Sequence, residues 1–506
     1  MKKVSRKATL IMVMLLFVLG AAHFTTAEMD GDLTAEQELA KDLHTILQDE
    51  RLDHAVAGVH VRSAESGEEL FSFNGGTSLV PASGQKLLAG AAALDRLGPE
   101  HTFNTEVLTN GEQRGAVLQG DLFIKGEGDP TILPADYEQM AGKIAEMGIK
   151  NIHGNIVADD TYFDDMRLSL DLSWFNQRRH TGAQVSALSF APDASLLSDA
   201  ALDRYNTASV YIEIHPGENP GDPAKVQVTP ETDAITIRND IETVESGGTR
   251  TFDWGREHGT NEIFFEGTLP VDGVRITQYV AVWEPTEVVL NLFNQALEEN
   301  GVQVHGDLTL GETPSNAQAL TSHHSMSLTE MMYPYMKLSQ NNHSEHLTKT
   351  LGKEVLGEGT WNNGLSVVEE YLERAGVDTS TVQLRDGSGM SHLNKIPPRE
   401  MTQLLFGVQK EDWFDLYYDS LPVAGMDDHM EGGTLRLRMR GTAAEGNAHA
   451  KTGTITSKTS LSGYVKTKDD EQLAFSIILN NFIGSSPTSV EDAIVVRLAE
   501  FSRGLE

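Results

Sequence analysis

The local sequence pattern changes twice along this chain. Residues before about 103 and after about 277 contain long runs with helical periodicity, whereas those between read as short strands broken by Gly, Pro and Asp clusters. A helix pattern at 137–147 is the one interruption of that central region. We therefore predict one α/β (α+β) domain in two parts, 28–102 and 278–506, separated by mainly β inserted subdomains at 103–277.

The periodicity also predicts individual elements. Helices are expected at 33–52, 83–97, 287–300, 328–351, 365–375 and 489–501. Strands are expected at 54–62, 70–73, 120–126, 234–238, 461–466 and 473–479. Ser83 would then stand at the N-terminus of a buried, Ala-rich helix.

The first 27 residues have the layout of a secretory signal peptide. Four basic residues precede an uncharged apolar run at 8–22, and small residues follow near Ala27. A retained membrane anchor is the alternative, but the run is shorter than the roughly 20 residues of a spanning helix. Without a Cys after the run, a lipoprotein anchor is excluded. We expect a secreted protein of the cell wall or periplasm, without a transmembrane anchor after processing.

Composition narrows the possible partners. The sequence contains no Cys, so stability must come from buried apolar area rather than from disulfides. The formal net charge is −35, and removing 1–27, with four basic and no acidic residues, leaves −35 − 4 = −39. A chain of that charge is not expected to bind nucleic acid.

Four short motifs follow one another along the chain. They are Ser83-Gly84-Gln85-Lys86, Ser339-Gln340-Asn341, Asp386-Gly387-Ser388-Gly389 and Lys451-Thr452-Gly453-Thr454. Each one alone occurs by chance in many proteins. The first, second and fourth together match the ordered motif set of β-lactamases and penicillin-binding proteins.

The first motif has a chemical reason for its spacing. Residues i and i+3 lie on one face of a helix, so Lys86 can bring its amine to the hydroxyl of Ser83. A weak nucleophile thereby gains an adjacent base. Free backbone N–H groups at a helix start can stabilise an oxyanion, and we expect the donors to come from Ser83 and Thr454.

Longer segments extend the match over nearly the whole mature chain. They resemble the class C low-molecular-mass penicillin-binding proteins, which are D-alanyl-D-alanine carboxypeptidase/endopeptidases. The matching segments are Pro81–Leu88, Gly126–Thr131, Val185–Ser189, Asp386–Ser391, Leu421–Gly425, Gly433–Leu435, Ala450–Thr454 and Ser460–Tyr464. That family has a transpeptidase-like domain with a large insertion between its first two motifs. The 252 positions between Lys86 and Ser339 (339 − 86 − 1) agree with this.

The resemblance implies a serine DD-peptidase that removes terminal D-Ala from peptidoglycan stem peptides, cleaves their D-Ala cross-links, or both. It implies β-lactams as covalent inhibitors. The implied roles are Ser83 as nucleophile, Lys86 as base, Ser339 as proton relay to the leaving amine, Asn341 as a substrate-amide contact, and Lys451, Thr452, Gly453 and Thr454 as the carboxylate site. No cofactor is implied.

Two positions depart from the family pattern. Gly84 replaces the common Thr after the nucleophile, and Gln340 replaces the common Asp between Ser339 and Asn341. Neither change removes a functional group from the mechanism. Asp386 and Ser388 lie in a Gly-bracketed segment that could be a plain turn, so neither is assigned a catalytic role.

Other functions remain open at this point. His343 and His346 could ligate zinc, but without a visible third ligand we predict no metal. A β-lactam or small-ester hydrolase would share the acyl-serine chemistry, although the insertion argues against an ordinary β-lactamase, and deacylation speed would separate the two. A wall-binding module without catalysis is a further alternative, which the intact Ser83, Lys86, Ser339 and Lys451 disfavour.

Overall fold

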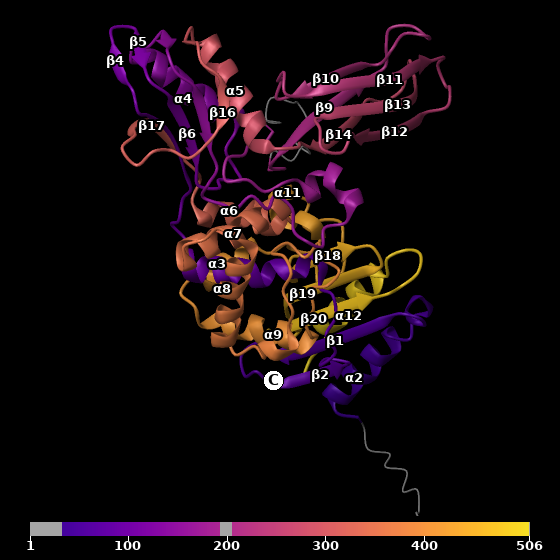
Figure 1. The fold of residues 1–506 in the computed structure, drawn as a ribbon. Coiled ribbons are helices and arrows are strands. Elements are labelled where there is room, and N and C mark those ends of the chain that lie inside the picture. The colour runs from indigo at the N-terminus through magenta and orange to yellow at the C-terminus, as the bar shows by residue number, and fades with distance from the viewer. Residues whose placement is uncertain (1–32, 193–204, 505–506) are drawn as a thin grey trace, which may run out of the picture.

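The computed structural model describes residues 33–192 and 205–504 (Figure 1). The signal peptide expected at 1–27 lies outside these ranges. Among the helices within them, none is both long and apolar enough to cross a bilayer.

A five-stranded antiparallel sheet is built from both ends of the chain. Its strand order is β18-β19-β20-β1-β2, so β1 from the N-terminal part pairs with β20 from the C-terminal part. The strands are β1 (Val56–Ser63), β2 (Glu69–Phe73), β18 (His449–Ile455), β19 (Lys458–Lys466) and β20 (Gln472–Asn480). The two outer parts of the sequence therefore form one domain.

Side chains of this sheet alternate between two cores. In β20, Phe475 and Ile477 face one core, and Ala474 and Ile478 face the other. This is the period of two that an extended strand requires. Strand β20 is buried on both faces, which explains its nearly continuous apolar sequence.

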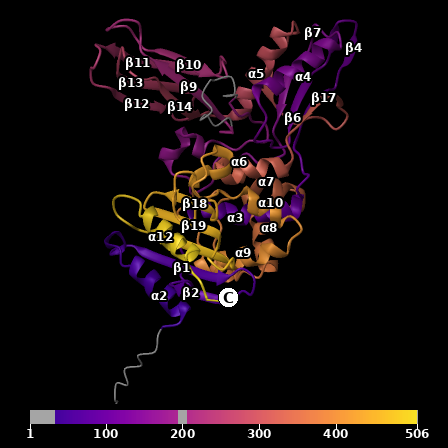
Figure 2. The same ribbon diagram turned by 180° about the vertical axis from the view of Figure 1, so that it is seen from behind.

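Helices cover both faces of the sheet (Figures 1 and 2). On one face lie α2 (Ala35–Ile46) and α12 (Thr488–Ala499). The other face packs against a group of helices: α3 (Lys86–Leu97), α6 (Leu328–Lys337), α7 (Asn341–Leu356), α8 (Trp361–Arg374), α9 (Pro398–Gly407) and α10 (Phe414–Ser420). The helical group carries the first two motifs.

The central region forms two bodies on one side of this domain (Figure 1). One combines α4 (Pro134–Glu146) and α5 (Pro285–Glu299) with two sheets, ordered β15-β7-β5-β4 and β16-β8-β6-β3-β17. Its strands are β3 (Asn104–Thr109), β4 (Glu112–Arg114), β5 (Val117–Gln119), β6 (Leu122–Gly126), β7 (Asn151–Ile152), β8 (Ile156–Asp159), β15 (Gln303–Val304), β16 (Leu308–Leu310) and β17 (Gln318–His324).

The other body is all β and contains two three-stranded sheets, ordered β10-β9-β14 and β11-β13-β12. Its strands are β9 (Ser209–His215), β10 (Lys225–Thr229), β11 (Thr236–Val244), β12 (Thr251–Arg256), β13 (Glu262–Pro270) and β14 (Ile276–Ala281). Among the described strands, none from either body joins the five-stranded sheet.

The second boundary of the insertion lies later than the sequence pattern suggested. Helix α5 packs on α4, and β17 pairs with β3. The Ser325 N–H donates to the Phe103 carbonyl at 2.9 Å, so the chain returns beside the point where it left. Residues 278–324, expected in the catalytic domain, thus belong with the inserted strands. The boundary at 277 is corrected to about 325, because long-range strand pairing is invisible to local periodicity.

Helices α7 and α8 pack unusually closely at Gly364. A Cβ placed there would lie 1.8 Å from the Thr348 carbonyl oxygen. We expect Gly364→Ala to lower the free energy of unfolding by about 1–3 kcal/mol through overpacking, as measured by urea denaturation. Acylation should fall too, because α7 carries Asn341.

Gly142→Ala is the matched control for that variant. Gly142 also lies inside a helix, but the nearest atom to its added Cβ is 3.6 Å away. Helix propensity then predicts a gain of up to about 1 kcal/mol. Equal effects of the two substitutions would contradict the close helix contact.

Candidate active site

Ser83 lies in a tight turn directly before a buried helix. The turn η2 (Ala82–Gln85) is a 3-10 helix and runs into α3, which begins at Lys86. Ala82 has a φ of +47°, a conformation that residues other than Gly, Asn and Asp rarely adopt. Ser83 is partly exposed, whereas Gly84, Gln85 and Lys86 are buried. The serine is therefore the member of its motif that faces solvent.

Strand β18 runs tightly against this turn. A Cβ at Gly453 would lie 2.4 Å from the Pro81 carbonyl oxygen and 3.0 Å from the Gly84 backbone nitrogen. The Ser460 hydroxyl, from β19, donates to the same Pro81 carbonyl at 2.5 Å. Gly453 thus has a steric role, because a side chain there would push the fourth motif away from Ser83.

Lys86 connects three motifs through its amine. Nζ lies 3.0 Å from Ser83 Oγ, 2.7 Å from Asn341 Oδ1 and 2.8 Å from the Ser388 carbonyl oxygen. A neutral amine has two N–H groups, and the two carbonyl-type oxygens can only accept. Both hydrogens are then used, and the lone pair is left for the hydroxyl of Ser83. This is the arrangement that a general base requires.

The surroundings also favour the neutral form of Lys86. The side chain is completely buried, and burial lowers its pKa from 10.5 to about 7, although the carboxylates of Glu345 and Asp386 act in the opposite direction. A buried ammonium loses its hydration, which is why the charged form is disfavoured.

Ser339 stands at a break between two helices. The sequence pattern predicted one helix over 328–351, but α6 ends at Lys337 and α7 begins at Asn341. Ser339 has a φ of +61°, which interrupts the helical path. Its hydroxyl accepts a hydrogen bond from Lys451 Nζ at 2.8 Å. The break is what turns this serine toward the cleft.

Lys451 lies within β18 and beneath the cleft. Its Nζ also donates to the Thr452 carbonyl at 2.9 Å. Burial and the positive charge of Lys86 hold the pKa of Lys451 well below its ordinary value. The fourth motif is therefore part of a strand. The sequence pattern had predicted a strand only further along the chain, at 461–466.

A cleft of about 600 Å³ brings the sequence-predicted residues together. Five of them line it: Ser83, Ser339, Asn341, Thr452 and Thr454. Lys86, Lys451 and Gly453 are buried beneath its floor. The Thr452 hydroxyl donates to that of Thr434 at 2.8 Å. Thr434 was not assigned as a site residue, although Gly433–Leu435 was one of the matching segments.

Asn341 joins the insertion to the site. Its Oδ1 accepts from Lys86, and its Nδ2 donates to the Thr181 carbonyl at 2.7 Å. Thr181 belongs to η4 (His180–Gly182), which also helps to line the cleft. One N–H and one lone pair of this amide remain, so Asn341 can contact a substrate amide while keeping both bonds. Sequence reasoning missed the part that Phe175, Arg179 and Thr181 play in the cleft wall.

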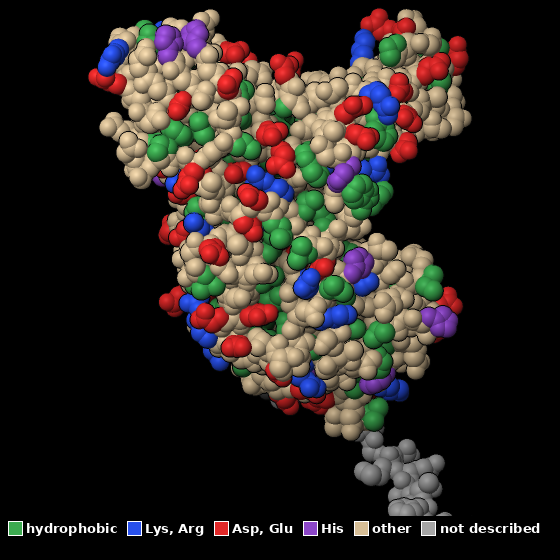
Figure 3. Space-filling view, viewed as in Figure 1, with side chains coloured by type: hydrophobic (Ala, Val, Ile, Leu, Met, Phe, Trp, Pro, Cys, Tyr) green, Lys and Arg blue, Asp and Glu red, His purple; other side chains and the backbone are tan. Residues whose placement is uncertain are grey.

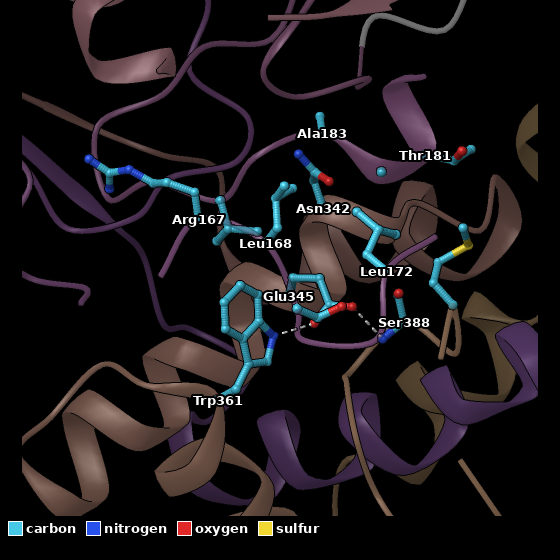
Figure 4. Close-up of a pocket in the computed structure, with 13 residues that line it drawn as sticks. Arg167, Leu168, Leu172, Thr181, Ala183, Asn342, Glu345, Trp361 and Ser388 are labelled. Atoms are coloured by element: carbon cyan, nitrogen blue, oxygen red, sulfur yellow. Dashed lines mark hydrogen bonds between the residues drawn. The ribbon is translucent and has the colours of Figure 1, made fainter. Parts of the chain in front are cut away.

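The third motif is held by a buried carboxylate (Figure 4). Glu345 accepts from the Trp361 indole at 2.7 Å, the Gly387 N–H at 3.0 Å and the Ser388 N–H at 2.9 Å. Ser388 in turn offers its carbonyl to Lys86. Glu345 thus fixes one of the two acceptors that orient the lysine.

Asp386 stabilises the same loop through hydrogen bonds to its own neighbours. It accepts from the Gly389 N–H at 2.9 Å and the Asn394 side chain at 2.7 Å. Burial and the neighbouring Glu345 raise its pKa to about 7. Asp386 therefore holds the loop in place. It is not among the described residues that line the cleft.

The two histidines of α7 are buried away from the cleft. His346 Nδ1 lies 2.9 Å from the Gly128 carbonyl oxygen. Burial lowers the pKa to about 3 for His343 and about 4 for His346, so both are neutral. In residues 33–192 and 205–504, no three His, Asp or Glu side chains are grouped so that they could hold a metal ion.

Comparison with known proteins gives matches over most of this chain. Residues 39–501 match the model of the D-Ala-D-Ala carboxypeptidase 3 (S13) family. The chain is 41% identical over 505 residues to a D-alanyl-D-alanine carboxypeptidase of Actinomadura sp., covering 98% of this chain and 91% of that protein. It is 23% identical over 428 residues to the carboxypeptidase DacB of Haemophilus influenzae, covering 84% and 85%.

A solved structure shares the fold. The crystal structure of penicillin binding protein 4 (dacB) from Haemophilus influenzae matches with a TM-score of 0.77 at 22% identity, over 90% of this chain and 98% of that one. The same protein complexed with a β-lactam matches with a TM-score of 0.72. The mixed α/β fold class inferred from the sequence is confirmed.

The pKa of Lys86 predicts how acylation depends on pH. Because that pKa lies near 7, the base form increases as the pH rises through 7 and is lost below it. We expect the acylation rate with benzylpenicillin to rise with a midpoint near pH 7. Lys86→Arg, which stays protonated, should lower the rate by about 100-fold or more, as stopped-flow kinetics would measure.

Lys353→Arg is the control, because Lys353 lies on α7 but outside the cleft. It should keep both the rate and the midpoint. A pH-independent rate in the wild type, or a fully active Lys86→Arg, would mean that another group is the base.

Proposed function

Because the chain belongs to the D-Ala-D-Ala carboxypeptidase 3 (S13) family, we propose that it is a penicillin-binding serine peptidase whose acyl-enzyme forms on Ser83. Its substrates are peptidoglycan stem peptides that end in D-Ala-D-Ala. The observation that carries the residue assignment is the position of Lys86 Nζ, 3.0 Å from Ser83 Oγ with its hydrogens directed to two other acceptors.

The acylation step follows from these contacts. Ser83 Oγ attacks the carbonyl carbon of the penultimate D-Ala while its proton passes to the lone pair of Lys86. The Ser83 and Thr454 N–H groups stabilise the oxyanion of the tetrahedral intermediate. The C–N bond then breaks, and the proton taken up by Lys86 passes through Ser339 to the leaving amine, which restores the neutral lysine. Water later attacks the ester and releases the shortened peptide, which restores Ser83.

The carboxylate of the leaving D-Ala is proposed to bind at Lys451, Thr452 and Thr454. The Lys451 amine donates to the Ser339 hydroxyl and to the Thr452 carbonyl, and the Thr452 hydroxyl contacts that of Thr434. Hydrogen bonds from several hydroxyls and an amine complement a carboxylate better than an amide. A cross-link that presents a carboxylate beside the scissile bond would fit the same place, so we propose endopeptidase cleavage as well.

The cleft favours a long-lived acyl-enzyme over rapid β-lactam hydrolysis. Among the described residues that line it, none is Asp or Glu. Glu345 and Asp386 are the carboxylates nearest to Lys86, but backbone N–H groups engage both. A carboxylate base that would activate water for fast deacylation is therefore missing from the described wall.

We also propose that the enzyme acts outside the cytoplasmic membrane. Peptidoglycan lies there, and the first 27 residues have the charge and hydropathy pattern of a signal peptide. β-Lactams would act as covalent inhibitors, consistent with the β-lactam complex of the Haemophilus influenzae relative.

A covalent adduct tests the nucleophile. We expect benzylpenicillin to add one penicilloyl group to the wild type, located on Ser83 by mass spectrometry and peptide mapping. Ser83→Ala should carry none and should lose peptidase activity, while Ser66→Ala, on an exposed turn, should behave as the wild type. An adduct that persists in Ser83→Ala would overturn the assignment.

The carboxylate site predicts a preference among substrates. We expect an acyl-D-Ala-D-Ala peptide to be hydrolysed with a kcat/KM about 10–100-fold above that of its C-terminal amide, since hydrogen bonds to a charged group contribute about 1.5–3 kcal/mol. Thr452→Val should narrow that ratio by slowing the acid more than the amide. Equal kcat/KM values for the two peptides in the wild type would contradict the proposed site.

A further inference from the structure

The segment that connects the insertion to the cleft exposes two adjacent aromatic rings. In η3 (Trp174–Arg178), Trp174 is 66% exposed and Phe175 is 53% exposed. Neighbouring large apolar side chains that remain in water commonly mark a binding surface. Together with Arg178, Arg179 and His258, they form what we call the arginine–aromatic patch.

Stacking contacts hold the patch in place. The rings of Trp174 and His258 have centroids 4.0 Å apart and planes inclined by 35°. The Arg178 guanidinium lies 4.5 Å from the centre of the Phe175 ring, and that of Arg179 lies 4.9 Å from it. These contacts limit the rotamers available to the exposed rings, so a ligand would meet a surface that is already ordered.

The patch is cationic within an acidic protein. The chain has 74 Asp and Glu against 39 Lys and Arg. Nevertheless, Arg178, Arg179 and the neighbouring Arg256 form no ion pair with another described residue. The carboxylate of Asp253 acts on Arg178 only from beyond ion-pair distance. An anionic ligand would therefore be attracted here although most of the surface repels it.

The patch continues into the catalytic cleft. Trp174, Phe175, Arg178 and Arg256 line a hollow of about 190 Å³. Phe175 also lines the catalytic cleft, where Arg179 joins it. In Figure 3, hydrophobic, cationic and histidine side chains gather between the all-β body and the catalytic domain, where Figure 1 places this segment. A chain-like ligand could thus occupy both surfaces at once.

We propose that the arginine–aromatic patch binds a second part of the peptidoglycan strand whose stem peptide occupies the cleft. The apolar face of a sugar ring would stack on Trp174, and a stem-peptide carboxylate would pair with Arg178 and Arg179. The proposal rests on the function proposed above. It predicts a preference for polymeric over small substrates, because two linked contacts raise the effective concentration of the strand.

The test measures binding of the full chain to purified insoluble peptidoglycan by co-sedimentation. Ser83→Ala serves as the background, so that no substrate is consumed. We expect Trp174→Ala to raise the dissociation constant about tenfold, a loss of about 1.4 kcal/mol, and Arg178→Gln to act similarly. Neither residue lines the cleft, so both variants with Ser83 restored should keep kcat/KM for a small acyl-D-Ala-D-Ala peptide within about twofold.

Two control substitutions match these changes elsewhere on the surface. Ile483→Ala removes an apolar side chain that is 85% exposed, and Arg114→Gln removes an exposed cation. Both should leave co-sedimentation unchanged. Glycan strands freed of peptide and free stem peptides, added as competitors, should each displace the protein more weakly than soluble glycopeptide.

Each outcome separates the two proposals. Unchanged binding of Trp174→Ala, or a loss in Arg178→Gln alone, would overturn the stacking site and leave only general attraction of anions. Full displacement by stem peptide alone would also overturn the sugar contact. Failure of the proposed function would appear separately, as absent acylation of Ser83 and absent turnover of the small peptide by the wild type.

Discussion

The buried amine of Lys86 is the contact on which the rest of the site depends. Its three neighbours come from residues 83, 341 and 388, which lie on separate segments of the chain. Burying an amine without partners is costly, so the fold must bring two acceptors to it as well as the serine. Glu345 holds one acceptor through the loop at 386–389, and Thr181 holds the other through Asn341. The inserted region thereby contributes to the position of the proposed base.

Local periodicity predicted most helices and the central strands of the catalytic sheet, because β20 is nearly continuously apolar and β1 alternates apolar residues with others. It missed β18, whose residues include Gly453 and several polar side chains. That strand is defined by its pairing with β19 and its contact with the turn at Ser83, neither of which a single segment encodes. The late boundary near 325 was missed for the same reason, because β17 is specified by its pairing with β3.

The motifs predicted several residues that line the cleft, but not how those residues are arranged. Their order identified five residues that line the cleft, since the chemistry fixes which side chains must be present. It could not reveal that Ser339 adopts a φ of +61° in a break between two helices, because the surrounding sequence favours helix throughout. Nor could it reveal that Glu345 holds the loop at 386–389, because the donors of that loop lie more than 40 residues away in the sequence. Here three donors, from Trp361, Gly387 and Ser388, satisfy the carboxylate.

The two buried lysines of the cleft differ in their counter-charges, which gives substrate binding an electrostatic consequence. Burial lowers the pKa of both lysines, but Glu345 and Asp386 partly offset this for Lys86, whereas the charge of Lys86 lowers the pKa of Lys451 further. A substrate carboxylate placed beside Lys451 supplies the missing counter-charge and stabilises its ammonium form. Coulomb repulsion is mutual, so a charged Lys451 disfavours the ammonium of Lys86 in turn. The carboxylate's own negative charge acts on Lys86 in the opposite direction, so the neutral base is favoured to the extent that the Lys451 ammonium lies nearer to Lys86 than the carboxylate does.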